Sequence, residues 1–402
     1  MKILVVCQYY YPEQFRINDI CEQLVLDGHS VNVLTGLPNY PEGKIPKEYK
    51  WGKKRKETIN GVQVIRSFEF GRGSNTVSLG LNYISYMISA SVKMLFMKKD
   101  FDLVFAYQLS PVTMVLPAII IKKIGKVPLY LYCCDIWPDS MKNIINNQDH
   151  IIYKVLKRFS TYIYSQSDEI GITSKPFFEY FQKVHSISIK KISYIPQHAE
   201  ETYLSIDEPV DNGVIDFVFM GNIGIAQDID CIIDAANIMH NDYHFKVHLV
   251  GDGSYLEKCK NKVKERQLSD YFIFHGRHPL DQMPKFYDIA DACLLTLKGD
   301  SLVGLTMPSK LQGYMAAGRP VFGAINGAAQ DIINESKCGV CVDASNSILL
   351  AEAMRDFIEN PLRYQECGKY GRKYFVENFT KDIYMKKLIN RFTRLLGETK
   401  YV

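Results

Sequence analysis

Residues 217–228 read FVFMGNIGIAQD, and this stretch passes from a short apolar run into a loop that contains Gly221 and Gly224. A short run of aromatic and β-branched residues favours a buried strand, and a helix is expected to start near Asp228. Glycines let a loop backbone approach a neighbour or a ligand closely, although they also suit a tight turn that serves geometry alone. The spacing is not GxGxxG, so a dinucleotide-binding fingerprint is not supported.

The same alternation of strand and helix recurs along the whole chain. The strands expected in the first series are Ile3–Cys7, Val31–Thr35, Val62–Ser67, Leu103–Tyr107, Leu129–Cys133 and Glu169–Thr173. Those of the second series are Phe217–Met220, Lys246–Val250, Tyr271–His275, Ala292–Thr296, Pro320–Ala324 and Gly339–Val342. Helical patterns fill the gaps, and Arg16–Asp27, which ends at Gly28, is an example. This order predicts an α/β protein with two Rossmann-like, doubly wound domains whose sheets are parallel.

The stretch Pro196–Val214 separates the two series. It is polar, rich in Asp and Glu, and has neither helical nor strand periodicity, so we interpret it as an inter-domain linker. The last stretch, Pro361–Val402, is helical and basic. Open α/β sheets bind ligands at the carboxyl ends of their strands, and helix N-termini there favour phosphate. Two such domains facing a cleft are expected to hold a phosphate-bearing ligand.

Composition excludes several classes of protein. The 402 residues carry 48 Lys plus Arg against 44 Asp plus Glu, a net charge of +4. That balance speaks against a nucleic-acid-binding protein. Most of the 10 cysteines lie in apolar runs, as reduced cysteines do, and no second CxxC or paired-histidine motif completes a zinc site with Cys338 and Cys341. The apolar run at the N-terminus is too short for a signal peptide, so a cytoplasmic protein is expected.

Two further loops carry chemistry. Val250–Ser254 reads VGDGS directly after an expected strand and suits either a loop that lines a binding site or a plain Asx turn. Thr306–Pro320 reads TMPSKLQGYMAAGRP, in which Pro308 and Ser309 open a helix that Ser309 is placed to cap. Lys310 puts a positive charge at the N-terminus of that helix, which is locally unfavourable unless an anion lies there. A solvated lysine in the first turn is the alternative.

Taken together, these motifs resemble those of glycosyltransferase family 4, whose members have the GT-B fold. The motifs are GNIG (221–224), VGDG (250–253), FHGR (274–277) and PSKLQGYMAAGRPVFG (308–323). Three N-terminal motifs, YYYPEQFR (9–16), LPNYPEG (37–43) and CDIWPDS (134–140), are similar to those of bacterial transferases of O-antigen and capsule assembly, of the L-fucosamine type. The matched segments run from residue 1 to about residue 380.

The resemblance implies an acceptor-binding domain over residues 1–198 and a nucleotide-sugar-binding domain over 205–377, with a C-terminal helix, about 378–402, that packs back on the first domain. It implies a UDP-sugar donor, retention of anomeric configuration, and no metal or other cofactor. A helix N-terminus and a lysine can neutralise the leaving diphosphate where other enzymes use a divalent cation. The donor-binding residues implied are Gly221, Asn222, Gly224, Gly253, His275, Arg277, Lys298, Met307, Ser309, Lys310 and Gln312.

The acceptor implied by the resemblance is a polyprenyl-diphosphate-linked saccharide, bound near Glu13, Arg16 and Asn39. The transferred sugar would be N-acetyl-L-fucosamine or a related amino sugar. Asp135 and Asp139 are the candidates for activating the acceptor hydroxyl, with Lys310 as the catalytic cation. The alternative for either aspartate is that it caps the helix after Pro138.

The chain departs from the family pattern at three positions. Two glutamates eight positions apart are common in the family, but Leu305 and Gly313 occupy the matching positions here, and Cys134 stands where many members have histidine. Asp228 and Asp230 fit the DxD pattern of metal-dependent transferases, but we interpret them as negative charge at a helix start.

A polyprenyl-linked acceptor would lie at the inner face of the cell membrane. Leu79–Met97 is rich in apolar and aromatic residues and is followed by Lys98 and Lys99, which suits an interfacial helix of a peripheral membrane protein. An ordinary core helix has the same apolar periodicity and is the alternative.

Two other functions stay open at this stage. A non-catalytic partner subunit on the same fold would explain the missing glutamates and Cys134. A sugar-nucleotide epimerase could use His198, His275 or His278, but it would leave the acceptor-side motifs unexplained.

Overall fold

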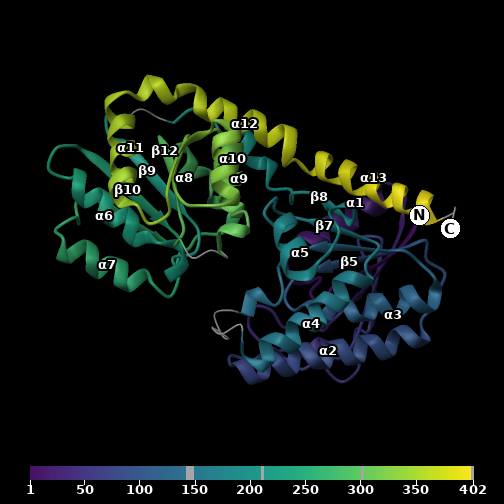
Figure 1. Ribbon diagram of the computed structural model, residues 1–402. Helices are drawn as coiled ribbons and strands as arrows, with labels where there is room; N and C mark the ends of the chain where they lie inside the picture. Colours follow the sequence, from purple (N-terminus) through teal and green to yellow (C-terminus); the bar gives the residue numbers. More distant parts are fainter. Residues whose placement is uncertain (142–148, 210–211, 300–302, 400–402) are drawn as a thin grey trace. The chain divides into compact units, whose positions relative to one another are not determined.

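The computed structural model describes residues 1–141, 149–209, 212–299 and 303–399. The chain divides into two compact units (Figure 1). Unit 1 comprises Met1–Ile195 together with Met385–Val402, and unit 2 comprises Pro196–Tyr384. The expected linker therefore belongs to unit 2, apart from residues 210 and 211, which lie outside the described residues. It includes a short 3₁₀ helix, η5 (Glu201–Ser205).

Unit 1 is built on one mixed sheet with the strand order β3-β4-β2-β1-β5-β6-β7-β8. The strands are β1 (Lys2–Val6), β2 (Ser30–Thr35), β3 (Lys56–Ile59), β4 (Val62–Arg66), β5 (Leu103–Gln108), β6 (Leu129–Cys133), β7 (Glu169–Ile172) and β8 (Ile192–Tyr194). Neighbouring strands pair in parallel except β3, which is antiparallel to β4 at the edge of the sheet. The central strands β5 and β6 are buried along their whole length, as strands covered on both faces are.

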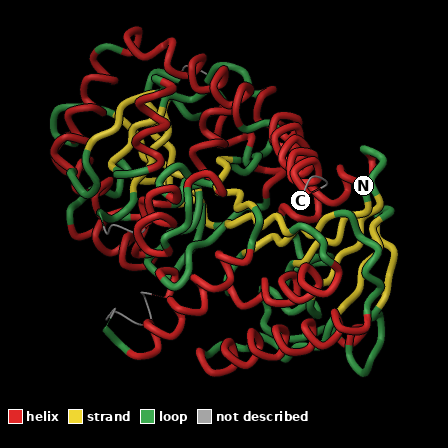
Figure 2. Tube along the Cα trace, turned by 45° about the vertical axis from the view of Figure 1, so that its right-hand side comes forward, coloured by secondary structure: helices red, strands yellow, loops and turns green. Residues whose placement is uncertain are grey.

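Helices cover both faces of this sheet, and Figure 2 shows the strands enclosed between helices. The helices are α1 (Arg16–Leu26), α2 (Thr76–Phe96), α3 (Leu116–Gly125), α4 (Ile151–Gln166) and α5 (Phe177–His185). The last helix of the chain, α13 (Lys381–Thr399), begins in unit 2 and ends in unit 1. There the ring of Phe392 lies 5.3 Å from the rings of both Phe105 and Tyr130, so this part of α13 belongs to the core of unit 1.

Unit 2 has a parallel sheet with the order β11-β10-β9-β12-β13-β14. Its strands are β9 (Ile215–Met220), β10 (Phe245–Val250), β11 (Phe272–Gly276), β12 (Ala292–Thr296), β13 (Val321–Ala324) and β14 (Gly339–Val342). Its helices are α6 (Ile229–Met239), α7 (Leu256–Glu265), α8 (Pro284–Asp288), α9 (Ser309–Ala316), α10 (Ala328–Ser336), α11 (Ser347–Glu359) and α12 (Gln365–Asn378).

The sequence of β9 explains how unit 2 forms a core on each face of its sheet. Side chains alternate along a strand, so Phe217 and Phe219 pack with α6 and α11 on one face. Val218 and Met220 point the other way and pack with α9. Short 3₁₀ helices complete the fold: η1 (Lys47–Tyr49), η2 (Val112–Val115), η3 (Asp139–Met141), η4 (Ile189–Lys191), η6 (Ile225–Gln227), η7 (Leu280–Gln282), η8 (Val303–Leu305) and η9 (Pro361–Tyr364).

The chain order places the loops that can bind ligands. In unit 1 the strand order changes direction between β1 and β5, and in unit 2 between β9 and β12. Ligands of open α/β sheets bind at such switch points, beyond the carboxyl ends of the strands. The loops after β1, β5 and β6 and those after β9, β10 and β12 are therefore the first places to look for a site.

Candidate functional site

The glycine loops after β9 and β10 pack directly against each other. The Gly221 amide donates to the Val250 carbonyl at 2.9 Å, and a Cβ on Gly251 would come within 1.8 Å of the Gly221 oxygen. A Cβ on Gly253 would come within 2.3 Å of the Ile223 oxygen. Gly221 and Gly251 also have positive φ angles, of 136° and 147°. Backbone packing therefore requires these glycines, whatever ligand the loops bind.

Lys310 lies against the first of these loops. It is the second residue of α9, and its Nζ lies 3.9 Å from the centroid of the Phe219 ring and donates to Gln227 Oε1 at 2.6 Å. A Cβ on Gly221 would lie 3.1 Å from this Nζ, so the glycine leaves room for the lysine. Within residues 1–141, 149–209, 212–299 and 303–399, no carboxylate pairs with Lys310. Burial lowers its pKa to about 7 because the charged form is desolvated.

The start of α9 differs from the prediction that Ser309 caps this helix. Pro308 holds the N-cap position with an extended backbone, and Ser309 is the first helical residue. The side chain of Ser309 therefore does not cap the helix, and it is exposed. The first amides of a helix have no partner within it, so this end offers N–H donors beside the Lys310 ammonium. Met307 is half-buried against the core of unit 2.

The remaining donor-side residues lie on neighbouring loops. Lys298 follows β12, and its amide donates to the Ala226 carbonyl at 3.0 Å, which places it beside the loop after β9. Asn222 and Arg277 are exposed. Gly224 packs against the amide group of Asn222, which would lie 2.7 Å from an added Cβ.

His275 is held by a chain of hydrogen bonds that the sequence did not indicate. Its Nε2 lies 2.9 Å from His248 Nδ1, and His248 Nε2 lies 2.8 Å from Asp216 Oδ1. The register between β10 and β11 shifts beside His275. Burial, together with the adjacent His248, lowers the pKa of His275. The ring of His275, near the carboxyl end of β11, is thus held by side chains from β9 and β10.

The prediction that Gln312 contacts the nucleotide sugar is wrong for its side chain. Gln312 is 3% exposed, and its Nε2 donates to the Gln197 carbonyl at 2.6 Å, so it tethers the start of unit 2 to α9. The neighbouring departure from the family also has a physical reason: a Cβ on Gly313 would lie 2.5 Å from the Tyr287 hydroxyl. A glutamate therefore does not fit at position 313 without rearrangement.

The DxD sequence has the structural role that we expected. Asp228 is the N-cap residue of α6 and accepts a hydrogen bond from Ser345 Oγ at 2.5 Å. Asp230 lies in the first turn, 3.0 Å from the Lys262 ammonium, and accepts from the Tyr255 hydroxyl. Among the described residues, no group of three or more His, Cys, Asp or Glu side chains is arranged to hold a metal ion.

In unit 1, Glu13 and Asn39, which the sequence predicts to bind the acceptor, are in contact with each other. Both are buried, and Glu13 Oε1 accepts from the amides of Asn39 and Tyr40 at 2.7 and 2.5 Å. Burial raises the pKa of Glu13 to about 7, although the two amides act in the opposite direction. Arg16, the first residue of α1, is half-buried near the same loop.

Glu69 is a second buried carboxyl group here, and sequence reasoning missed it. It accepts from Asn39 Nδ2 at 2.7 Å and from Gln8 Nε2 at 2.9 Å, and burial raises its pKa well above the usual range. A Cβ on Gly36 would lie 2.5 Å from its Oε1, so the glycine makes room for it. The only sequence signal was a charged residue between two phenylalanines, in SFEFG (67–71).

Asp135 lies at the carboxyl end of β6, where the loop from β5 meets it. Its two carboxylate oxygens accept hydrogen bonds from the hydroxyls of Ser110 and Ser140. Trp137 Nε1 donates to Ser110 Oγ at 3.0 Å and fixes that serine in turn. Asp135 is only half-buried, so its carboxylate is oriented by two hydroxyls and still accessible.

The charges of Asp135 and Arg72 both act on the Tyr83 hydroxyl. Burial raises the pKa of the Tyr83 hydroxyl, while the charge of Arg72 lowers it and that of Asp135 raises it. The Arg72 guanidinium lies 5.4 Å from the Tyr40 ring centroid, and its amide donates to Asn39 Oδ1 at 3.0 Å. Arg72 thus lies against the loop after β2 and also acts on the same tyrosine as Asp135.

Asp139 does not have the position of a catalytic base, and that prediction is corrected. It is 4% exposed and accepts from the hydroxyls of Tyr153, at 3.0 Å, and Tyr180, at 2.5 Å. Both tyrosines are buried as well. The carboxylate therefore satisfies two buried donors and holds α4 and α5 to the loop after β6.

Asp139→Asn should destabilise unit 1 and leave turnover by the folded protein nearly unchanged. The substitution removes the charge from two hydrogen bonds in a buried site, and we expect a loss of about 1–3 kcal/mol in the free energy of unfolding. Urea unfolding followed by tryptophan fluorescence measures the loss. An unchanged unfolding midpoint together with strongly reduced turnover would instead make Asp139 a catalytic candidate again.

Comparisons with known proteins find glycosyltransferases among the similar sequences and structures. Residues 205–374 match the family model described as Glycosyl transferases group 1. The chain is 26% identical over 278 residues to a protein of Pseudomonas aeruginosa named probable glycosyltransferase WbjE, a match that covers 66% of this chain and 68% of that protein. Shorter matches, to GDP-mannose-dependent mannosyltransferases of mycobacteria and to O-antigen chain mannosyltransferase C of Escherichia coli, span less than half of each relative's length.

Solved structures share the fold over almost the whole chain. Sucrose-phosphate synthase from Thermosynechococcus elongatus aligns with a TM-score of 0.76 at 14% identity and covers 99% of both chains. HepE from Anabaena, solved in complex with UDP, aligns with a TM-score of 0.70 at 13% identity, over 98% of this chain and 100% of that one. Residues 205–374 therefore form a domain that matches Glycosyl transferases group 1, and the two parallel-sheet units have the GT-B fold of the glycosyltransferases among these solved structures.

Proposed function

We propose that this protein is a retaining, metal-independent glycosyltransferase of family 4 that uses a UDP-sugar as donor. Its acceptor would be a polyprenyl-diphosphate-linked saccharide in the assembly of O-antigen or capsule, and the sugar N-acetyl-L-fucosamine or a related amino sugar. The sugar, the acceptor lipid and the retention of configuration rest on the motif resemblance of the N-terminal loops. The O-antigen chain mannosyltransferase among the relatives supports the pathway class.

One observation carries the proposal for the donor. Lys310 is a desolvated ammonium group beside the N-terminus of α9 and the Gly221 loop, and no carboxylate pairs with it among the described residues. Such a group is expected to bind an anion, and the diphosphate of a nucleotide sugar supplies one. The UDP complex of HepE favours uridine as the nucleoside. The GDP-mannose-dependent relatives make a GDP-sugar the competing donor.

The chemistry follows from charge. As the bond between the anomeric carbon and the diphosphate oxygen breaks, negative charge grows on the leaving group, and Lys310 with the free amides of α9 stabilises it. The acceptor hydroxyl oxygen forms the new bond to the anomeric carbon on the face from which the diphosphate leaves, as retention requires, and its proton passes to a carboxylate. We assign that carboxylate to Asp135, which two serine hydroxyls orient and which is still accessible.

Glu13, Asn39 and Glu69 would shape the acceptor site of unit 1. With its pKa raised to about 7, the Glu13 carboxyl group is partly protonated at neutral pH, so it can donate as well as accept hydrogen bonds. Burial raises the pKa of Glu69 as well. That dual capacity suits the recognition of sugar hydroxyls.

We also propose that unit 1 docks on the inner face of the cell membrane through α2. Seven apolar side chains of this helix are 49–84% exposed. They follow one another at intervals of three or four residues, except for the adjacent last two, and are Val77, Leu81, Ile84, Ile88, Val92, Leu95 and Phe96. A solvent-facing stripe of this kind suits an interfacial helix better than an ordinary surface helix. No helix in the described part of the chain is long and apolar enough to cross a membrane.

The experiment for the proposed function is a donor panel. Purified protein is incubated with UDP- and GDP-sugars and a short-chain polyprenyl-diphosphate saccharide, and release of the nucleoside diphosphate is measured. Turnover with a UDP-sugar supports the proposal. Turnover with a GDP-sugar alone changes the donor, whereas nucleotide release without acceptor consumption favours the epimerase. Folded protein that neither turns over nor binds UDP would be the non-catalytic partner subunit.

A further inference from the structure

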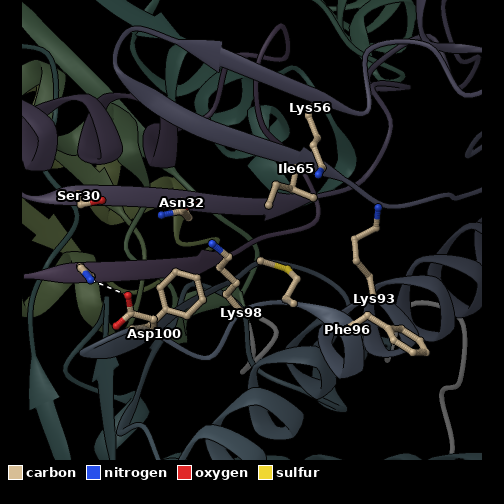
Figure 3. A pocket seen from close by; sticks show the side chains of 11 residues that line it. Ser30, Asn32, Lys56, Ile65, Lys93, Phe96, Lys98 and Asp100 are labelled. Carbon is tan, nitrogen blue, oxygen red and sulfur yellow. Dashed lines mark hydrogen bonds and ion pairs between the residues drawn. The ribbon is translucent and has the colours of Figure 1, made fainter.

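A pocket of about 560 Å³ lies in unit 1 between the C-terminal half of α2 and the β2–β4–β3 side of the sheet (Figure 3). None of the candidate acceptor residues Glu13, Asn39, Glu69 or Asp135 lines it. Asn32 and Ile65 belong to the strands that form its floor, and residues from the end of α2 form a wall. The pocket is therefore separate from the candidate active site, and the proposed chemistry does not use it.

Lysines from four different segments converge on this pocket. Lys2 comes from β1, Lys56 from β3, Lys93 from α2, and Lys98 from the segment after it. In Figure 3 the side chains of Lys56 and Lys93 point toward one another. Only one carboxylate, Asp100, also lines the pocket, and it pairs with Lys2 at 2.6 Å.

Lys93 is the most informative of the four. Its Nζ donates to the Arg66 carbonyl at 3.0 Å, and no carboxylate pairs with it in residues 1–141, 149–209, 212–299 or 303–399. Burial lowers its pKa, and the charges of Arg55 and Lys56 lower it further. Lys93 is half-buried, whereas Lys2, Lys56 and Lys98 are exposed at the rim. A cluster of like charges with a single carboxylate beside it attracts an anion.

The pocket opens beside the apolar face of α2. Ile65, Phe96, Met97 and Phe101 contribute its apolar lining. Phe96, which is 84% exposed, belongs both to this lining and to the exposed stripe of α2. An apolar face that continues into a cationic pocket matches a molecule with a phosphate at one end and hydrocarbon at the other. A soluble nucleotide or free phosphate would leave the apolar stripe uncovered.

We propose that this pocket binds the phosphate of an anionic phospholipid head group, with the acyl chains of that lipid lying along the apolar face of α2. The proposal rests on the membrane docking suggested above and deepens it, because it adds a specific head-group site. Attraction to anionic lipid grows with each lysine near the surface. The site would fix the orientation of unit 1 on the membrane, which an apolar stripe alone does not do.

The test compares two variants that lose the same charge. The pocket variant carries Lys56→Gln, Lys93→Gln and Lys98→Gln. The control carries Lys50→Gln, Lys53→Gln and Lys54→Gln, which change exposed lysines of the same unit that do not line the pocket. Both are sedimented with vesicles of phosphatidylcholine alone and of phosphatidylcholine with phosphatidylglycerol, and melting temperatures confirm that they are folded.

We expect the wild type to bind the phosphatidylglycerol vesicles, and the pocket variant to bind them at least about tenfold more weakly than the control. Equal binding by the two variants would overturn the head-group site but leave membrane docking intact. A third variant, Ile84→Ser with Ile88→Ser, tests the docking itself and should weaken binding to all vesicles. Two results would overturn both the docking and the head-group site. One is that the wild type binds neither kind of vesicle, and the other is that the wild type forms a dimer that the third variant does not form.

Inorganic phosphate distinguishes a lipid site from a general phosphate site. At millimolar concentration it should compete only weakly with vesicles, because it cannot use the apolar wall around Phe96. Complete release of the protein by phosphate, with no loss in the Ile84→Ser, Ile88→Ser variant, would assign the pocket to a soluble anion and refute the lipid.

Discussion

Lys310→Met is expected to lower turnover by about 100- to 1000-fold, because it removes the cation that stabilises the leaving diphosphate. The effect should be larger on the turnover number than on donor binding, since the charge on the diphosphate grows as the bond breaks. The fold should survive, because methionine keeps the length and apolar stem that pack against Phe219 and Gly221. Steady-state kinetics with the active donor measures the loss.

The matched control is Lys264→Met on α7, an exposed lysine of the same unit, which should leave turnover unchanged. Stability provides a second comparison. The pKa of Lys310 is lower in the folded protein than in the unfolded chain, so this lysine destabilises the folded protein. The loss is present from low pH and disappears as the pH rises to the pKa of the unfolded chain. Removing that lysine should raise the melting temperature at pH 7. Full activity of Lys310→Met would remove this residue from the mechanism.

Asp135→Asn is expected to lower turnover by about 100-fold or more and to leave UDP affinity almost unchanged. The amide keeps the shape of the carboxylate and can still bond to Ser110 and Ser140, but it cannot take the proton of the acceptor hydroxyl. Calorimetry with UDP and kinetics with saturating acceptor separate the two quantities.

Asp139→Asn is the natural companion of this variant. Asp135→Asn should lose turnover at constant stability, whereas Asp139→Asn should lose stability at nearly constant turnover. The reverse pattern would exchange the roles of the two aspartates. Equal loss of UDP affinity and turnover in Asp135→Asn would show that this residue does not act on the acceptor.

The fold was largely predictable because most of its strands can be recognised from a short apolar run in the sequence. Each of the twelve expected strands is present, with ends that differ by at most two residues, since buried parallel strands are continuous apolar runs. The two strands that were missed lack this mark. β3 reads KETI and alternates polar residues at an edge, and β8 has only three residues. Neither buries enough apolar surface to stand out in the sequence.

The candidate site was predictable where the backbone determines it. The glycine loop at Gly221–Gly224 and the helix start at Pro308–Lys310 depend on turn chemistry, which sequence carries directly. Side-chain partners over long sequence distances were not predictable. The hydrogen bond from Gln312 to Gln197 spans 115 positions, and nothing local to Gln312 distinguishes a tether from a sugar contact.

The same dependence on long-range partners explains why the role of Asp139 was predicted wrongly and why Glu69 was missed. In sequence, Asp135 and Asp139 are two aspartates of one loop, and only the tyrosines of α4 and α5 tell them apart. Glu69 became visible as a buried carboxyl group only when the loops after β1, β2 and β4 were brought together. Long-range packing, and not local propensity, decides which polar residues are accessible.

The central claim is that Lys310, a half-buried lysine with no carboxylate partner among the described residues, binds the diphosphate. Calorimetry of UDP binding at pH 8 tests it most directly. With a pKa of about 7 in the free protein, Lys310 is mostly neutral at that pH, and a bound diphosphate raises its pKa. Binding to the wild type should therefore take up close to one proton, measured in two buffers of different ionisation enthalpy, and affinity should fall as pH rises above 7. Lys310→Met should take up almost none. Proton uptake that is equal in both proteins, or no UDP binding by folded wild type, would contradict this role of Lys310.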